Sequence, residues 1–64
     1  MRYFFISYSH DKGFGNMTLI LEEFPSQNAV DRTVKEQYPN INSVAILYIY
    51  EFRNKEDFDR FNGN

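Results

Sequence analysis

An uninterrupted run of apolar and β-forming residues, Ser43 to Phe52 (SVAILYIYEF), limits the folds open to this chain more strongly than any other stretch. Side chains alternate along a strand, which predicts one face with Val44, Ile46, Tyr48, Tyr50 and Phe52 and another with Ala45, Leu47, Ile49 and Glu51. Both predicted faces are apolar, so the strand needs cover from two layers. In a chain of 64 residues one helix can supply only one layer, which is a first indication of self-association.

The composition bounds the size of the core. The chain fits a single domain, residues 1–64, in the size range where one core barely offsets chain entropy. Cysteine is absent, so no disulfide or thiolate-zinc site can add stability. Seven Phe and five Tyr are a large apolar load for so short a chain. We therefore expect some rings at an interface between copies, in a homodimer or a higher homo-oligomer.

Basic and acidic residues are scattered along the chain, seven against nine, and give a formal charge of −2. This balance argues against binding of extended nucleic acid, which depends on clustered Lys and Arg. No apolar run approaches the roughly 18–20 residues that span a bilayer. The N-terminal segment MRYFFISYSH lacks the small-residue cleavage site of a secretory signal. We expect a cytoplasmic protein without membrane contact.

Two β-strands are predicted in the first third of the chain. Arg2 to Ser9 (RYFFISYS) combines aromatic and β-branched residues, and Asn16 to Glu23 (NMTLILEE) has one apolar and one mixed face. Between them, His10 to Gly15 contains two glycines, which reach positive φ without steric penalty. This segment is predicted to close a hairpin or a bulged loop.

One main helix is predicted after the second strand. Ser26 or Asn28 is the expected N-cap, and the helix should continue to about Tyr38 because a proline follows. Val30, Val34 and Tyr38 recur every four residues, a stripe that can cover one face of a small sheet.

A short second helix is predicted at the C-terminus. Asn54 can cap it, and Phe58 and Phe61 lie three residues apart on one of its faces. A segment of this length needs docking against the rest of the chain to be stable.

These elements predict a small α+β fold in the order β-β-α-β-α. A hairpin followed by a right-handed crossover gives a three-stranded, mostly antiparallel sheet of order 2-1-3, with the main helix on one face. The hairpin loop His10 to Asn16 and the turn Tyr38 to Ser43 should then lie at the same end of the sheet. Tyr3 and Phe5 should be exposed on the opposite face, which favours sheet-to-sheet or edge-to-edge homodimerisation.

The segment Phe5 to Lys12 (FISYSHDK) resembles the first sequence box of Toll/interleukin-receptor homology (TIR) domains. The resemblance covers eight of 64 residues. The resemblance implies that a helix follows this box, in a doubly wound parallel fold more than twice as long as this chain. Here, Gly13 to Asn16 instead leads directly into another predicted strand. No later segment supplies a matching catalytic glutamate, so no functional residue is carried over from that family.

The hairpin loop and its surroundings are the candidate ligand site. Glycine-exposed backbone amides can cradle an anion, Lys12 adds a positive charge, and aromatic side chains can stack on a flat ring. In the alternative interpretation the glycines only close the hairpin and the polar residues are solvated. The predicted ligand-binding residues are Tyr8, Ser9, His10, Lys12, Gly13, Phe14, Gly15, Asn16 and Tyr38.

No catalytic or metal-binding arrangement is predicted, and no cofactor. His10 lies beside Ser9 and Asp11, but adjacent side chains in a strand or turn point apart, so nothing orders a nucleophile, a base and an orienting group. The acidic residues lack the regular ligand spacing of a calcium loop. The basic residues Arg2, Lys12 and Arg53 either flank aggregation-prone strands or form a phosphate pocket in a symmetric dimer.

The predicted function is non-enzymatic binding by a small homo-oligomer. The preferred ligand is a small anionic, ring-bearing molecule such as a nucleotide signal. By analogy with compact, acidic phage-encoded accessory proteins, the chain would act as a sponge that sequesters it. The alternative is a protein-interaction or inhibitor module that acts through a sheet edge or an aromatic face with Tyr3, Phe5, Tyr48 and Tyr50. A third possibility is an enzyme at an oligomer interface with His10 as general base.

Overall fold

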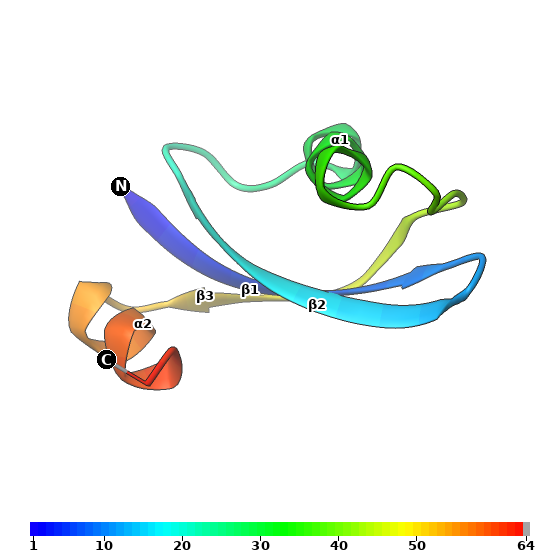
Figure 1. Cartoon of the computed structure of the whole chain (residues 1–64). Coiled ribbons are helices and arrows are strands. Elements are labelled where there is room, and N and C mark those ends of the chain that lie inside the picture. Colours follow the sequence, from blue (N-terminus) through cyan, green and yellow to red (C-terminus); the bar gives the residue numbers. More distant parts are fainter. Residues whose placement is uncertain (64) are drawn as a thin grey trace.

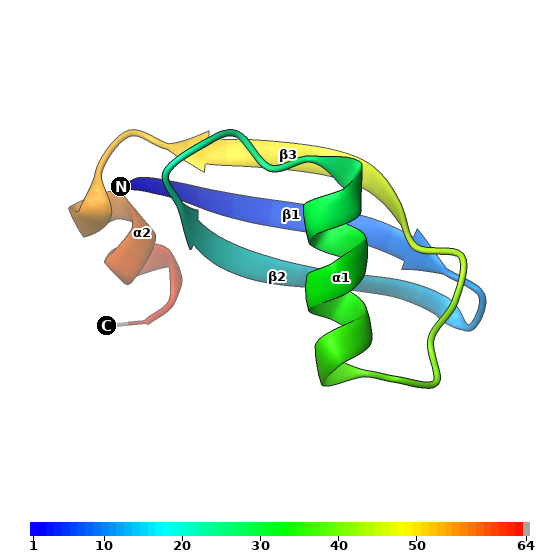
Figure 2. The same ribbon diagram turned by 90° about the horizontal axis from the view of Figure 1, so that it is seen from above.

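The computed structural model describes residues 1–63 and consists of one sheet with a helix on each side. In Figures 1 and 2, α1 crosses one face of the sheet and α2 lies at one end of the other face. The sheet has the order β2-β1-β3, and both strand pairs are antiparallel. The predicted α+β fold, its element order and its sheet order are therefore confirmed. The elements are β1 (Arg2–His10), β2 (Gly13–Leu21), α1 (Gln27–Gln37), β3 (Ala45–Phe52) and α2 (Lys55–Phe61).

The β1–β2 hairpin is tighter than the sequence suggested. Its turn is only Asp11 and Lys12, and β2 begins at Gly13 rather than at Asn16. The register pairs His10 with Gly13 and continues through the segment that was expected to be a loop. Gly13 has a φ of 139°, a conformation that L side chains rarely adopt, so glycine at this position allows the chain to leave the turn and pair at once.

The hydrophobic core lies between α1 and the central strand. Phe4, Ile6 and Tyr8 are buried on one side of β1 and pack with Val30 and Val34 of α1. Val44 completes this cluster of buried residues. Two residues of the predicted stripe, Val30 and Val34, are thus buried, whereas the third, Tyr38, is the C-cap of α1 and is exposed.

Capping decides where α1 begins. The side chain of Ser26 accepts a hydrogen bond from the backbone N–H of Ala29 at 3.1 Å, so Ser26 is the N-cap and Asn28 lies inside the first turn. Gln27 then ties this end of α1 to β3. Its side-chain amide donates to the Val44 carbonyl (2.7 Å) and its carbonyl oxygen accepts from the Ile46 N–H (3.1 Å).

A β-bulge changes which residues of β3 share a face. Tyr8 pairs with Ile46 but the preceding Ser7 pairs with Tyr48, so Leu47 is an extra residue on β3. Val44 and Ile46 therefore face α1, while Tyr48, Tyr50 and Phe52 lie on the other side of the sheet. The prediction that all five of these side chains lie on one face of β3 is wrong, because the inserted residue reverses the period-two alternation.

The sheet face opposite α1 is called the open face. Along the three strands it carries Tyr3, Phe5, Ser7, Ser9, Phe14, Asn16, Thr18, Ile20, Ala45, Tyr48, Tyr50 and Phe52.

The second helix covers one end of the open face. The Asn54 side chain accepts from the Asp57 N–H at 2.9 Å and caps α2, as predicted. Phe58 is buried, with its ring 5.1 Å from that of Tyr3 and 5.5 Å from that of Phe52. Tyr3 and Phe5 are consequently half-buried rather than exposed as predicted, because α2 docks over them, with Phe58 against Tyr3 and Phe61 against Phe5.

The hairpin turn and the α1–β3 connection meet at one end of the sheet, as predicted. The N–H of Asp11 donates to the carbonyl of Asn42, and the N–H of Asn42 donates to the Asp11 carboxylate. Two segments 31 residues apart in sequence are thereby held together.

Candidate functional site

The structure distributes the predicted ligand-binding residues over both faces of the β1–β2 hairpin. The register places Tyr8, His10, Gly13 and Gly15 on the α1 side. It places Ser9, Phe14 and Asn16 on the open face, and Lys12 lies in the exposed turn. Tyr38, at the C-cap of α1, is 53% exposed.

Tyr8 is the best-defined member of the α1-side group. Its ring lies directly over Gly15, where an added Cβ would come within 2.6 Å of the ring. The ring centroid of His10 is 5.9 Å away. Burial raises the pKa of Tyr8, and the nearby Tyr38 hydroxyl raises it further. Gly15 is therefore explained by the space that Tyr8 occupies.

Polar groups at the hairpin turn form hydrogen bonds within the turn and with the α1–β3 connection. The Lys12 N–H donates to His10 Nδ1 at 3.1 Å, so Nδ1 acts as an acceptor in this geometry. The Asn42 N–H, which donates to the Asp11 carboxylate at 3.0 Å, holds the pKa of that carboxyl below its ordinary value. Phe14 is 79% exposed on the opposite face from the buried Tyr8. The loop residues thus lie on two faces of the hairpin.

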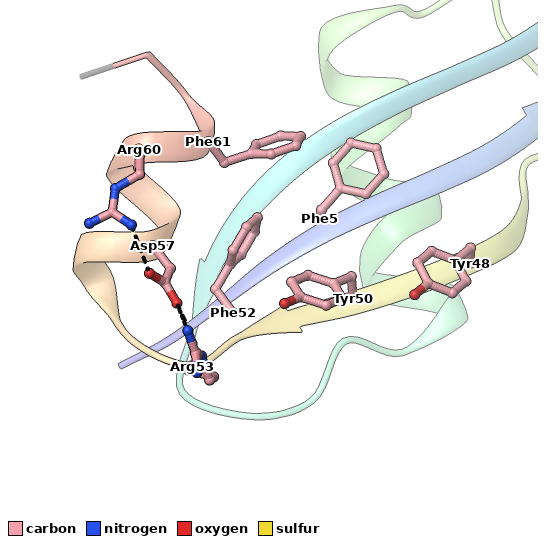
Figure 3. A pocket seen from close by; sticks show the side chains of 8 residues that line it. All are labelled: Phe5, Tyr48, Tyr50, Phe52, Arg53, Asp57, Arg60 and Phe61. Carbon is pink, nitrogen blue, oxygen red and sulfur yellow. Dashed lines mark hydrogen bonds and ion pairs between the residues drawn. The ribbon is translucent and has the colours of Figure 1, made fainter.

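A concave site does lie at the other end of the molecule, between β1, β3 and α2. Figure 3 shows this groove, in which aromatic rings form the walls and charged side chains lie at the α2 end. Its volume is about 560 Å³, within the range of small-molecule sites. The lining residues are Phe5, Tyr48, Tyr50, Phe52, Arg53, Asp57, Arg60 and Phe61. We call it the aromatic groove.

The walls of the aromatic groove are mutually packed rings. The ring of Phe61 lies 5.2 Å from that of Phe5 and 5.3 Å from that of Phe52, and Tyr50 is 5.1 Å from Phe52. These tilted and edge-on contacts fix the ring orientations. Tyr48 and Tyr50 remain 58% and 45% exposed, so they present aromatic surface to an incoming group.

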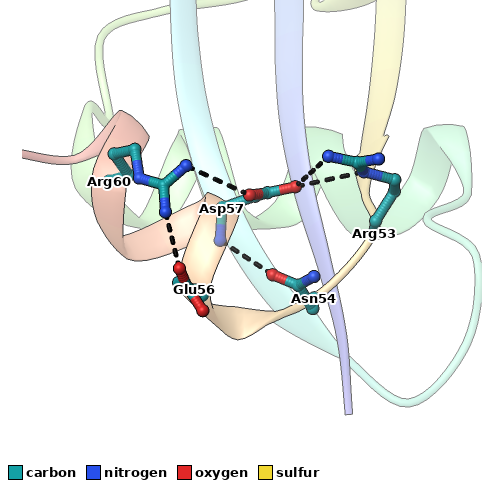
Figure 4. Close-up of polar contacts among 5 residues, drawn as sticks. All are labelled: Arg53, Asn54, Glu56, Asp57 and Arg60. Carbon is teal, nitrogen blue, oxygen red and sulfur yellow. Dashed lines mark hydrogen bonds and ion pairs between the residues drawn. The ribbon is translucent and has the colours of Figure 1, made fainter.

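Two arginines stand at the charged end, joined through one carboxylate. Asp57 accepts from Arg53 Nε at 3.2 Å and lies 3.7 Å from an Arg60 nitrogen, while Arg60 also donates to Glu56 at 2.6 Å (Figure 4). The two arginine side chains are 83% and 69% exposed. Exposed ion pairs of this kind are worth about 0–1 kcal/mol, so an anion can compete for either guanidinium. Arginine also binds carboxylate and phosphate groups bidentately.

The basic residues singled out in the sequence are not brought together. Arg2 donates to Glu51 through two nitrogens at 2.8 Å, and its guanidinium lies over the rings of Phe4 and Phe24. Lys12 lies in the hairpin turn, and Arg53 lies in the aromatic groove. Within one chain, then, only Arg53 of these three contributes to the groove.

The sequence predictions missed the groove as a site. The sequence names Phe5, Tyr48 and Tyr50 only as an aromatic face for a protein partner, and Phe61 only as part of the short helix. Their meeting depends on the bulge, which turns Tyr48 and Tyr50 toward the face where α2 docks. The available signal was the pair Phe58 and Phe61, because a short helix with two large rings must dock somewhere.

Three further findings bear on the functional class. Among residues 1–63, no group of three or more acidic or histidine side chains is placed to hold a metal ion. Neither helix in the described part of the chain is long and apolar enough to cross a membrane. Comparison with known proteins found no family model, no curated protein and no solved structure that matches this chain.

Proposed function

We propose that this protein is a non-enzymatic binding protein that sequesters a small anionic, ring-bearing ligand, such as a nucleotide, in the aromatic groove. The observation that carries the proposal is the combination of exposed tyrosine rings with two exposed arginines around one cavity. The proposal keeps the ligand class suggested by the sequence but moves the site from the hairpin loop to the α2 end of the open face. As a cytoplasmic sponge, the protein would act by binding alone.

The two parts of such a ligand suit the two ends of the groove. A flat ring can stack on Tyr48 or Tyr50, and base–aromatic stacking contributes about 1–3 kcal/mol per base. A phosphate or carboxylate can then reach Arg53 or Arg60, which need only exchange one exposed ion pair for another. The proposed ligand class therefore rests on rings and cations that line one cavity.

The ion pairs made by the charged side chains of the aromatic groove also support a binding role. Arg53, Asp57 and Arg60 form ion pairs, and the other polar side chains of the lining are the hydroxyls of Tyr48 and Tyr50. These groups do not combine a nucleophile with a base and an orienting partner.

Isothermal titration calorimetry with three related probes tests the proposal. Adenosine monophosphate carries both ring and anion, adenosine lacks the anion, and ribose 5-phosphate lacks the aromatic ring. We expect the monophosphate to bind most tightly, and either loss to weaken binding at least about tenfold, which corresponds to 1.4 kcal/mol. Absence of binding by all three probes would contradict the proposal.

Variants assign the site. Tyr50→Ala and Arg60→Gln should each weaken binding of the monophosphate about tenfold or more, because each removes one of the two recognition elements. Arg32→Gln, on the exposed side of α1, is the matched control for loss of a positive charge. If Lys12→Ala abolishes binding while Arg60→Gln does not, the ligand binds at the hairpin and the groove assignment is wrong.

The second candidate is a protein-interaction or inhibitor module acting through a sheet edge or the aromatic face. A specific observation favours it: Phe14 and Ile20, which are not among the groove-lining residues, are 79% and 47% exposed on the open face. A small ligand in the groove gives no reason for these two apolar side chains to be exposed outside its lining. Phe14→Ala distinguishes the candidates, because it should weaken a protein contact and leave nucleotide binding unchanged.

A further inference from the structure

We infer that a second copy of this chain packs face to face on the open face, so that the sheets of two protomers form the two layers of a symmetric dimer. The proposed contact surface is the part of the open face beyond the buried Phe58, and it shares Tyr48, Tyr50 and Phe61 with the aromatic groove. The dimer is therefore expected in the absence of ligand, and a bound nucleotide would compete with the second copy for these rings. Three observations support it: the exposed apolar area, the absence of charged side chains at the strand positions of the open face, and the hydrogen bonds already made at the β3 edge.

The exposed apolar area is of the size that a dimer needs. Phe14, Tyr48, Tyr50 and Phe61 are between 45% and 79% exposed on this side of the molecule. At about 150–250 Å² for each fully exposed aromatic side chain, the four rings present roughly 350–600 Å². A stable interface buries about 800 Å² per partner. The rings alone therefore supply about half of the required area, and Ile20 with the small residues between them adds more.

The strand residues of the open face are also suited to packing against the same residues of a second copy. All twelve positions are uncharged, and between the rings lie hydroxyl and amide groups, among them Ser7, Asn16 and Thr18. In a two-fold dimer the same patch occurs on both partners, so a charge close to the two-fold axis would meet its own copy. Hydroxyls and amides both donate and accept hydrogen bonds, and they can pair with their own copies. An anionic or cationic partner would find no complementary charge on these strands.

Pairing through the edge of β3 is less favourable than face packing. The Val44 carbonyl and the Ile46 N–H at the start of this edge are already bonded to the Gln27 side chain. An added strand would have to displace two hydrogen bonds in order to extend the sheet there. The open face needs no such rearrangement.

Sedimentation velocity of the full chain, from low micromolar to millimolar concentration, measures the association. We expect a monomer–dimer equilibrium for the wild type. Thr18→Glu places a negative charge on the open face about halfway along β2, and Phe14→Ser removes the most exposed ring of this face. Each should raise the dimer dissociation constant about tenfold or more. Phe14 is not among the residues that line the aromatic groove, so ligand binding can be measured separately in Phe14→Ser; Thr18 pairs with the groove residue Phe5 and is used for association only.

Tyr38→Ser is the matched control, because Tyr38 is similarly exposed but lies at the end of α1. It should leave the dissociation constant unchanged, and circular dichroism checks that all three variants are folded. Wild-type protein that stays monomeric at millimolar concentration overturns the inference. So does association that Thr18→Glu and Phe14→Ser do not weaken, since the contact would then lie elsewhere. Equal weakening by Tyr38→Ser also overturns it, because the association would be unspecific.

Discussion

Asp11 and Asn42 are joined by two hydrogen bonds in opposite directions, each 3.0 Å long. The Asp11 N–H donates to the Asn42 carbonyl, and the Asn42 N–H donates to Asp11 Oδ1. The hairpin turn thereby holds the connection from α1 to β3, just before the bulged strand begins. The pair therefore fixes the end of the sheet at which β3 begins. The bulge that follows in β3 determines which side chains lie on the open face.

The first prediction concerns the pH dependence of this pair. The Asn42 N–H lowers the pKa of Asp11, so the ionised carboxylate stabilises the fold above the ordinary aspartate pKa of about 4. That contribution should be lost as the pH falls below this value and through the lower folded-state pKa. Asp11→Ala should have a lower melting temperature than the wild type at pH 7, and the difference should narrow toward acid pH.

Thermal unfolding, followed by circular dichroism from pH 7 down to below the ordinary aspartate pKa of about 4, checks the prediction. Asp11→Asn keeps an acceptor oxygen without the charge, and its melting temperature should fall between those of the other two proteins at pH 7. Glu23→Gln, in the β2–α1 connection, controls for loss of an exposed carboxylate. A constant difference between Asp11→Ala and wild type at every pH would show that the charge plays no part.

The second prediction concerns Gly15, which lies under the Tyr8 ring. A Cβ at this position would approach the ring to 2.6 Å, and the ring is only 4% exposed, so it must shift within a packed core. Gly15→Ala should therefore lower the free energy of unfolding by about 1–3 kcal/mol. Urea denaturation measures this change. In the background of Tyr8→Leu, where the ring is absent, the same substitution should cost much less; equal costs in both backgrounds would exclude the steric explanation.

The third prediction concerns the Gln27 contact with β3. Gln27→Ala removes two hydrogen bonds, one to the Val44 carbonyl and one from the Ile46 N–H, and should destabilise the fold by about 1–3 kcal/mol. Gln27→Glu retains an acceptor but cannot donate when ionised. Its stability should therefore recover in part at acid pH, where the protonated carboxyl can donate again. Gln37→Ala, at the exposed end of the same helix, is the control and should change stability little. Equal effects of the alanine variants in urea denaturation would contradict a specific role for Gln27.

The fourth prediction concerns the docking of α2. Phe58 is 7% exposed and packs against Tyr3 and Phe52, whereas Phe61, on the same helix, is 56% exposed. Phe58→Ala should cost about 3–5 kcal/mol if the fold is retained, and Phe61→Ala clearly less. Hydrogen exchange of the α2 amides should accelerate strongly in the first variant, since a helix this short depends on docking. Protection that persists in Phe58→Ala would mean that another contact holds the helix.

Much of the architecture followed from local pattern. The alternating aromatic residues of β1, the stripe of Val30 and Val34, and the Ser26 and Asn54 caps are properties of nearby residues, and they predicted element order and sheet order correctly. The hairpin was also predicted, but its turn is shorter because backbone pairing extends to Gly13 once the strands meet.

The candidate site was not predictable in this way. No local signal marks Leu47 as the extra residue of a bulge, because the bulge arises from pairing with Ser7 and Tyr8 forty residues earlier in the chain. That one insertion turns Tyr48 and Tyr50 away from α1, and α2 then docks beside them to complete the groove. The sequence by itself determined which segments become strands and helices, since those depend on periodicity and caps. Only the tertiary structure decided which side chains share a face, because that depends on the register between strands.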